Sequence, residues 1–188
     1  MSTELTKPFI IAEIGNNHEG SFSVAKKLVV EAAKAGVDAV KFQTFDVQEF
    51  LNEDHKNFKL YKKFQLSKKQ FIDLSILTKK LQMKFISTPL DIKSSDFLSK
   101  IVDIFKIASG DNNFELLIEN VLKYKKKTLI STGLLNFREI KKLKLFINSK
   151  KFPLNKLIIM HCVSAYPTKL NEANLLSIKY LKDKLKIN

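Results

Sequence analysis

The most informative stretch of this chain is Ile10-Ile11-Ala12-Glu13-Ile14-Gly15-Asn16-Asn17-His18-Glu19-Gly20. In it an apolar run ends in an acid, and a turn of glycine and asparagine follows that carries a histidine and a second acid. A helical pattern begins directly afterwards. Polar residues at the end of a buried strand are unfavourable unless they have a role. Because α/β enzymes carry their chemistry at the C-terminal ends of parallel strands, the next question is whether this βα unit recurs.

The βα unit recurs six times. Strands are expected at residues 9–14, 39–43, 84–87, 104–107, 128–131 and 156–161, and helices at 23–35, 67–81, 95–100, 113–124, 136–148 and 172–185. Capping patterns open the helices at Ser67 and Asn136, and a longer polar stretch covers 46–66. Repeated βα units predict a parallel sheet with right-handed crossovers, and the nearly continuous apolar strands are typical of burial on both faces.

An open doubly wound sheet and a barrel both fit this order of elements. Polar residues stand at or just past every expected strand end, namely Glu13, Lys41, Gln43, Thr88, Lys106, Ser109, Ser131, His161 and Ser164. In an open sheet only the strands beside a switch point converge on a ligand, whereas in a barrel all of them do. The sequence therefore predicts one domain over 1–188 with an α/β fold of TIM-barrel type. Its six βα units are two short of the usual eight and of roughly 250 residues.

Composition narrows the class of protein. The chain has 188 residues, 45% hydrophobic and 28% charged, as expected for a globular protein. Neither a signal-peptide run in Met1–Pro8 nor a bilayer-spanning segment is found in the sequence. Cys162 is the only cysteine, so no internal disulfide is possible. A cytoplasmic protein is therefore expected. The net charge of +14 is attributed to solvated, lysine-rich helix faces, with attraction for an anionic ligand as the alternative. No nucleic-acid-binding motif is present.

Two lysines are the strongest candidates for ligand binding. Lys41 and Gln43 lie two apart on one strand, so they point to the same side. A lysine that points into a barrel is a buried charge that needs an anion, although an outward, snorkelling lysine is the alternative. Lys106 repeats the situation two strands later, and with Thr88 between them the pair suits a phosphate plus a carboxylate. For any single serine or threonine, ordinary turn chemistry explains the residue better, and only their joint position at one rim favours ligand binding.

Other catalytic patterns are weak or missing. His18 and Glu19 in a turn indicate turn chemistry more than a metal site, and the adjacent His161 and Cys162 face opposite sides of a strand. No zinc spacing, serine-hydrolase elbow, Walker motif or dinucleotide motif occurs.

The chain resembles the sialic acid synthase (N-acetylneuraminate synthase) family. The resemblance rests on six segments in the family's order, namely 10–20, 40–44, 85–89, 105–110, 130–133 and 161–168. It implies a TIM-barrel catalytic domain followed by a small antifreeze-like domain, which this chain lacks. The implied reaction joins C3 of phosphoenolpyruvate to the aldehyde of an N-acetylated amino sugar such as N-acetylmannosamine. Water then adds at C2 and phosphate leaves, which gives a nonulosonic (sialic) acid for surface carbohydrates.

The resemblance also assigns roles to individual residues. Phosphoenolpyruvate is expected at Lys41, Thr88, Lys106, Ser109 and Ser164, where Ser164 replaces the asparagine of many members, and the sugar at Glu13, Gln43 and Tyr166. Glu13 is the candidate for proton transfer. The family uses Mn²⁺ or Mg²⁺, whose histidine ligands lie on later strands that are not in this chain, and it forms homodimers. A truncated member, with activity of the isolated chain in question, is therefore expected.

Two other functions stay open. One is a Schiff-base aldolase that uses Lys41 or Lys106, and the other is a non-catalytic paralogue that binds phosphorylated ligands. Neither a membrane nor a nucleic acid is an expected partner. The sequence does not distinguish neuraminic, legionaminic and other sugars.

Overall fold

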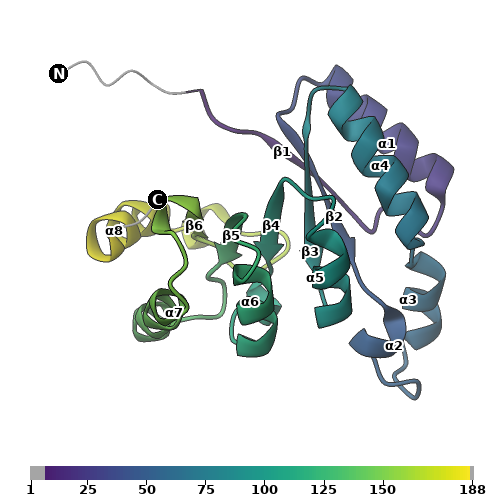
Figure 1. The fold of residues 1–188 in the computed structure, drawn as a ribbon. Coiled ribbons are helices and arrows are strands. Elements are labelled where there is room, and N and C mark those ends of the chain that lie inside the picture. The colour runs from purple at the N-terminus through teal and green to yellow at the C-terminus, as the bar shows by residue number, and fades with distance from the viewer. Residues whose placement is uncertain (1–6, 187–188) are drawn as a thin grey trace.

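Six strands form one parallel sheet in which each strand lies beside its neighbour in the sequence. The computed structural model describes residues 7–186. Most of Met1–Pro8, where no signal-peptide run is predicted, lies outside these residues. The strands are β1 (Ile11–Gly15), β2 (Ala39–Thr44), β3 (Lys84–Pro89), β4 (Ile104–Ile107), β5 (Lys127–Ser131) and β6 (Leu157–Met160). All six predicted strands and their parallel order are confirmed (Figure 1).

Six of the helices follow the strands as predicted. They are α1 (Phe22–Lys34), α4 (Lys68–Lys80), α5 (Ile92–Leu98), α6 (Glu115–Leu122), α7 (Phe137–Ser149) and α8 (Leu176–Leu185). Both predicted capping boxes are present: the side chains of Ser67 and Asn136 accept from the third helical N–H, and the glutamine or glutamate there bonds back. Short 3-10 helices cover η1 (Ser109–Asp111), η2 (Leu154–Lys156) and η3 (Leu170–Glu172).

Three helical predictions need correction. The stretch 46–66, predicted only as a longer polar stretch, contains α2 (Val47–Phe50) and α3 (Phe58–Phe64). Their aromatic residues form a separate small core around Phe45, Val47 and Phe58, and this burial stabilises helices too short to form alone. Helix α5 covers 92–98 rather than 95–100. Helix α8 begins at 176 rather than 172, because the preceding residues turn as the 3-10 helix η3.

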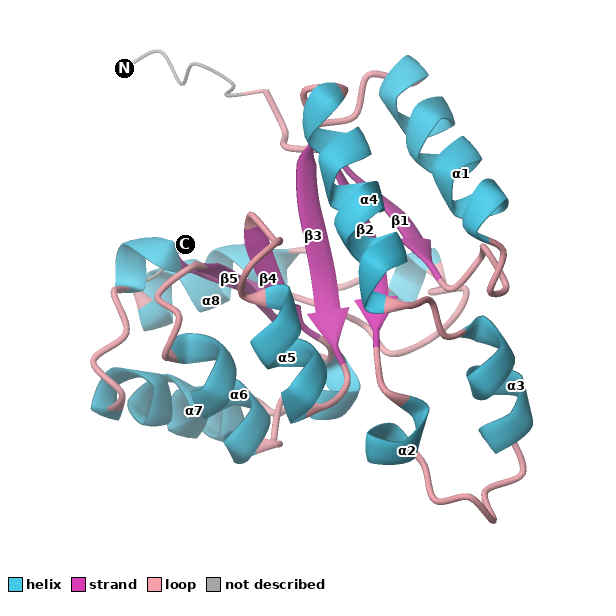
Figure 2. Ribbon diagram, turned by 45° about the vertical axis from the view of Figure 1, so that its right-hand side comes forward, coloured by secondary structure: helices cyan, strands magenta, loops and turns pink. Residues whose placement is uncertain are grey.

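The sheet has two different faces. Its outer face packs under the helices in the main core, which includes Phe42, Phe85, Phe105 and Ile130. Figure 2 shows α1, α4, α5, α6 and α7 along the outside of the curved sheet. The inner face carries a smaller apolar cluster of Ala39, Ile86, Ile104, Leu129, Ile11, Ile158 and Met160. Alternate residues of each strand therefore point to the inside, as in a barrel.

The sheet is an open barrel within the described residues. Strand β1 pairs only with β2, and β6 pairs only with β5, so both are edge strands, as the count of βα units predicted. Because all strands run in parallel, their C-terminal ends lie at one rim of the curved sheet, and this rim positions the candidate site. None of the helices in 7–186 combines the length and the apolarity that crossing a membrane requires.

Candidate functional site at the strand ends

Glu13 and Lys41 form an ion pair across the first two strands. They are direct neighbours in the parallel register of β1 and β2, and both point to the inner face. The Lys41 side chain is 16% exposed, whereas that of Glu13 is 49% exposed. The structure thus places Lys41 inside the sheet, in agreement with the orientation predicted from the sequence.

Lys106 lies deeper in the same inner face and has neutral partners. The residue is only 7% exposed. Its ammonium group donates to the Ile107 carbonyl at 2.8 Å and to Ser131 Oγ at 2.5 Å. No carboxylate in the described part of the chain forms an ion pair with it. Burial, and secondly the charge of Lys41, lower the pKa of Lys106 from 10.5 to about 8. The site therefore holds a buried cation that lacks an anionic partner, which is an arrangement that favours a bound anion.

Ser131 and Asn112 connect the neighbouring loops. The sequence places Ser131 among the polar residues at the strand ends without assigning it a role, and it does not indicate Asn112. Ser131 Oγ also accepts from Cys162 Sγ at 3.1 Å, and Asn112 Nδ2 donates to the carbonyls of Ser131 at 3.2 Å and of Gly133 at 2.8 Å. The sequence did offer a signal for Ser131, which ends a predicted strand. Asn112 gives no such signal, because its contacts come from residues about 20 positions away.

Ser109 and Ser164 meet at Gly133, although they follow different strands. A Cβ atom built on Gly133 would lie 2.6 Å from Ser109 Oγ and closer still to Ser164 Oγ. Both hydroxyls therefore occupy the space that a side chain at position 133 would fill. The loops after β4, β5 and β6 converge here, beside the Lys106–Ser131 hydrogen bond.

Gln43 and Thr88 lie on the inner face near the C-terminal ends of β2 and β3. They are neighbours in the register of β2 and β3, and the Thr88 side chain is buried. Asn16 Nδ2 donates to Gln43 Oε1 at 2.7 Å, while Asn16 Oδ1 is buried without a protein partner. The turn quoted at the start of the chain thus supplies a polar contact to the site.

Tyr166 is the one predicted site residue that the structure does not bring to the others. Its side chain is 98% exposed, as is that of Leu170 further along the same segment. This segment after β6 has few packing partners among residues 7–186. The expected contact of Tyr166 with a sugar stays a prediction.

The histidines do not form a metal centre. His18 is buried against Phe42, its Nδ1 accepts from the Gly20 N–H at 3.1 Å, and burial lowers its pKa, which fits the turn role. His161 Nε2 lies 3.0 Å from the Ala173 carbonyl. Within 7–186 no three histidine, cysteine or acidic side chains are grouped closely enough to hold a metal ion. The residues present in 7–186 therefore do not fit the divalent metal of the resembled family.

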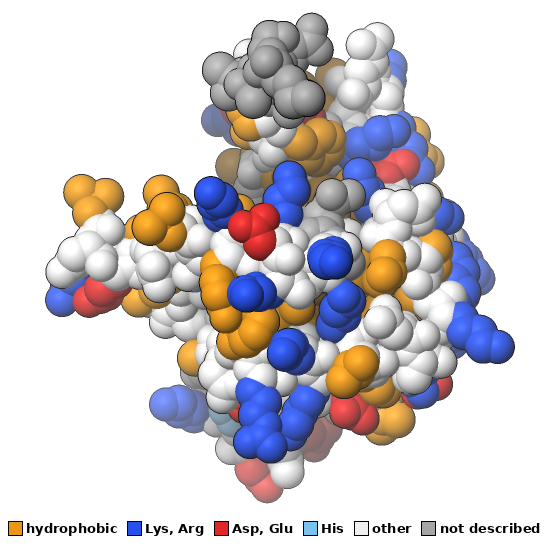
Figure 3. Space-filling model, turned by 90° about the vertical axis from the view of Figure 1, so that its left-hand side faces the viewer, with side chains coloured by type: hydrophobic (Ala, Val, Ile, Leu, Met, Phe, Trp, Pro, Cys, Tyr) orange, Lys and Arg blue, Asp and Glu red, His pale blue; other side chains and the backbone are white. Residues whose placement is uncertain are grey.

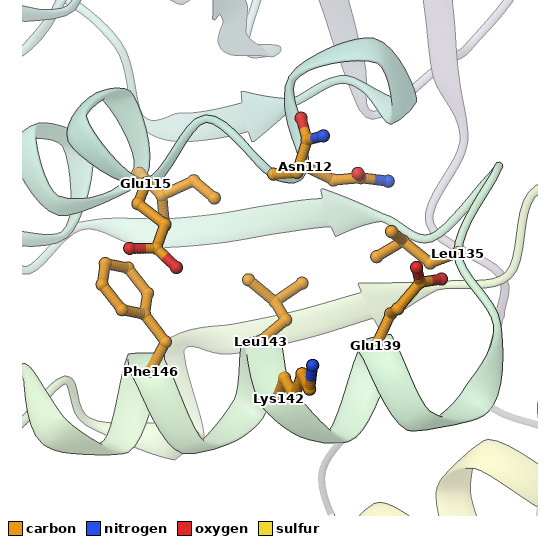
Figure 4. Close-up of a pocket in the computed structure, with 9 residues that line it drawn as sticks. Asn112, Glu115, Leu135, Glu139, Lys142, Leu143 and Phe146 are labelled. Carbon is orange, nitrogen blue, oxygen red and sulfur yellow. The ribbon is translucent and has the colours of Figure 1, made fainter.

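A further pocket lies between two helices of the outer layer. Figure 4 shows it between α6 and α7, with Glu115 on one side and Glu139, Leu143 and Phe146 on α7 opposite. Asn112 borders this pocket and is its link to the strand ends. Figure 3 shows basic side chains, nearly all of them lysines, scattered over the α7 and α8 side of the molecule. This spread fits solvated helix faces better than one binding patch.

The fold and the site together define a class of protein: an α/β protein of TIM-barrel type with two inward lysines, a carboxylate and several hydroxyls at its strand ends. The model of the NeuB family matches residues 28–188, and the chain belongs to this family.

Named relatives support the assignment. The chain is 42% identical to an uncharacterized protein of Methanocaldococcus jannaschii, over 93% of this chain and 51% of that protein. It is 32% identical to the N,N'-diacetyllegionaminic acid synthase of Campylobacter jejuni, over 98% of this chain and 60% of the enzyme. The crystal structure of N-acetylneuraminic acid synthetase from Leptospira borgpetersenii, in complex with citrate, superposes with a TM-score of 0.88 at 35% identity. That match covers 95% of this chain and 62% of the other. The chain thus spans about half to three fifths of the length of these relatives.

Proposed function

We propose that this chain forms the anion-binding part of a synthase that condenses phosphoenolpyruvate with an N-acetylated amino sugar to give a nonulosonic acid and phosphate. The observation that carries the proposal is the buried Lys106, which has only neutral acceptors and lies on the same inner face as Lys41. Membership of the NeuB family, with relatives named as legionaminic and neuraminic acid synthases, supports it.

In the proposed reaction the lysines bind and orient the anionic substrate. Lys41 and Lys106, assisted by hydroxyls of Thr88, Ser109 and Ser131, hold the phosphate and the carboxylate of phosphoenolpyruvate by charge-assisted hydrogen bonds. Gln43, beside Lys41, faces the sugar. Fixing both substrates at one rim lowers the entropic barrier to their reaction.

Glu13 is proposed to transfer the proton. The C3 carbon of phosphoenolpyruvate attacks the sugar aldehyde, a carbon–carbon bond forms, and the aldehyde oxygen becomes an alkoxide. The Glu13 carboxylate, paired with Lys41, takes a proton from the water that adds at C2 and passes it to this alkoxide. Water adds at the cationic C2 and phosphate leaves with its bridging oxygen, which yields the 2-keto acid. A divalent metal would have to be held by residues outside those described. Homodimer formation, a cytoplasmic location and the single-domain boundaries stay predictions.

Calorimetry with phosphoenolpyruvate tests the binding half of the proposal. The 188-residue chain is expected to bind, and Lys106→Met and Lys41→Met each to weaken binding at least tenfold, which corresponds to about 1.4 kcal/mol. Lys27→Met, on the exposed side of α1, is the matched control and leaves the affinity unchanged. Equal binding by all four proteins would refute the proposed site.

Turnover is tested with Mn²⁺, phosphoenolpyruvate and N-acetylmannosamine, by measuring phosphate release and the product mass. Turnover by the chain itself would show that the described residues suffice. Substrate binding without turnover is the result expected if residues elsewhere in the full-length relatives complete the reaction.

The lowered pKa of Lys106, about 8, specifically favours a second candidate function. An amine with this pKa is partly neutral near pH 8 and can attack a carbonyl carbon, with loss of water, to form an imine. Borohydride would reduce this imine to a stable adduct. A mass increase on Lys106 after treatment with pyruvate and borohydride would favour the aldolase-type function, and its absence would exclude it.

A further inference from the structure

The two lysines of the site differ in how their charge is compensated. Lys41 is paired with a carboxylate, Glu13, whereas Lys106 has only a carbonyl and a hydroxyl as acceptors. Anion binding at Lys106 therefore adds a missing partner. Anion binding at Lys41 requires that the existing partner be replaced, because one ammonium group has room for few close anions.

Glu13 is the partner that is free to leave. Its side chain is half exposed, and β1 is an edge strand, so the carboxylate has access to water when it is unpaired. Lys41 is held in β2 between two paired strands and remains mostly buried. Gly15 also leaves space beside Glu13, since a Cβ at position 15 would lie only 3.1 Å from Glu13 Oε1.

We propose that Glu13 acts as an internal competitor: in the ligand-free chain its carboxylate takes the position beside Lys41 that an anionic group of the substrate occupies when bound. Binding then exchanges one ion pair for another and releases the Glu13 carboxylate toward the rim. The inference rests on the proposed function of this site as an anion site. It gives the Glu13–Lys41 pair a part in the affinity for substrate in addition to the proton transfer proposed for Glu13.

Glu13→Gln separates these roles in a binding experiment. Glutamine keeps the shape of the side chain and removes the charge that competes for Lys41. Affinity for inorganic phosphate and for phosphoenolpyruvate, measured by calorimetry, is expected to rise about tenfold, because a partly exposed ion pair no longer has to be broken. The cationic excess of the site also grows by one charge, so affinity is expected to fall more steeply with added salt.

Two further variants complete the test. Glu19→Gln removes one charge from the exposed turn after β1 and controls for net charge, with no expected change in affinity. In a Lys41→Met background, Glu13→Gln is expected to give no gain, since the competition requires the lysine. Glu13→Ala provides a second removal of the carboxylate and should behave as Glu13→Gln does.

The outcomes are distinct. Tighter binding in Glu13→Gln that disappears in the Lys41→Met background supports the inference. Unchanged or weaker binding in both Glu13 variants, while the unsubstituted chain binds phosphoenolpyruvate, overturns the inference and leaves the proposed function in place. If neither the unsubstituted chain nor any Glu13 variant binds phosphate or phosphoenolpyruvate, both proposals fail.

Discussion

Replacing Lys106 by methionine should make the protein more stable at neutral pH while it removes anion binding. Methionine fills much of the space of the lysine stem and carries no charge. The buried ammonium group is unfavourable in the ligand-free chain, because its desolvation outweighs its hydrogen bonds to the Ile107 carbonyl and the Ser131 hydroxyl and its attraction to the more distant Glu13 and Asp111. The charge of Lys106 is therefore retained at the expense of folding stability.

The magnitude follows from the pKa. A decrease from 10.5 to about 8 corresponds to about 3 kcal/mol at pH 7, at about 1.4 kcal/mol per pKa unit. Between pH 8 and 10.5 the unfolded chain binds more protons at this lysine than the folded chain, so wild-type stability rises with pH in that window. The free-energy cost of burying the Lys106 amine in the folded chain therefore decreases to about 1 kcal/mol at pH 10. Loss of two hydrogen bonds in Lys106→Met offsets about 1–2 kcal/mol of the gain.

Urea denaturation of both proteins at pH 7 and pH 10 measures this effect. The stability advantage of Lys106→Met over the wild type should decrease by about 2 kcal/mol between the two pH values. The difference cancels the titration of groups that are remote from Lys106. Lys27→Met, an exposed lysine on α1, should show no pH-dependent difference. A constant difference between Lys106→Met and wild type across this range would refute the argument that Lys106 is held charged at neutral pH against its burial.

Substitutions at Gly133, Gly20 and Asn136 test local features, and Gly110→Ala and Gly36→Ala are the controls for the first two. Gly133→Ala should weaken phosphoenolpyruvate binding at least tenfold, because its Cβ would collide with the serine hydroxyls there, whereas Gly110→Ala meets no atom within 4 Å and should bind normally in calorimetry. Gly20→Ala should lower the free energy of unfolding by about 2 kcal/mol or more in urea titrations, since its Cβ would lie 2.0 Å from a carbonyl of α3. Gly36→Ala has open space and a similar positive φ, so a loss of about 1 kcal/mol is expected. Asn136→Ala should lose about 1 kcal/mol with the capping box of α7, and thermal unfolding that is unchanged would contradict this.

Local patterns predicted most of the secondary structure correctly. The strands were identified by their apolar runs, and Ser67 and Asn136 marked helix starts because capping depends on residues three positions apart. Helix α5 begins three residues before its predicted start, because Asp91 caps it by accepting from the Ser94 N–H at 2.7 Å. Helices α2 and α3 were missed because they are stabilised by an aromatic cluster that forms only after β2, α3 and the loop after β3 come together.

The candidate site was predictable in part. Polar residues at strand ends are visible in the sequence, so Glu13, Lys41 and Lys106 could be selected before any contact was known. Their partners could not be selected. The meeting of hydroxyls at Gly133 and the two carbonyls bound by Asn112 depend on loops that follow different strands.

The recurring βα unit, the parallel sheet and the charged residues at one rim can be predicted from local patterns, because they follow from side-chain periodicity and chain direction. Which of these charges has a partner depends on how the strands and loops pack together. Lys41 and Lys106 look alike in the sequence, yet the register of β1 and β2 gives Lys41 a carboxylate, while the curvature of the sheet leaves Lys106 buried among neutral groups. The reason is physical: desolvation and charge pairing depend on distances across the sheet, which no local pattern specifies.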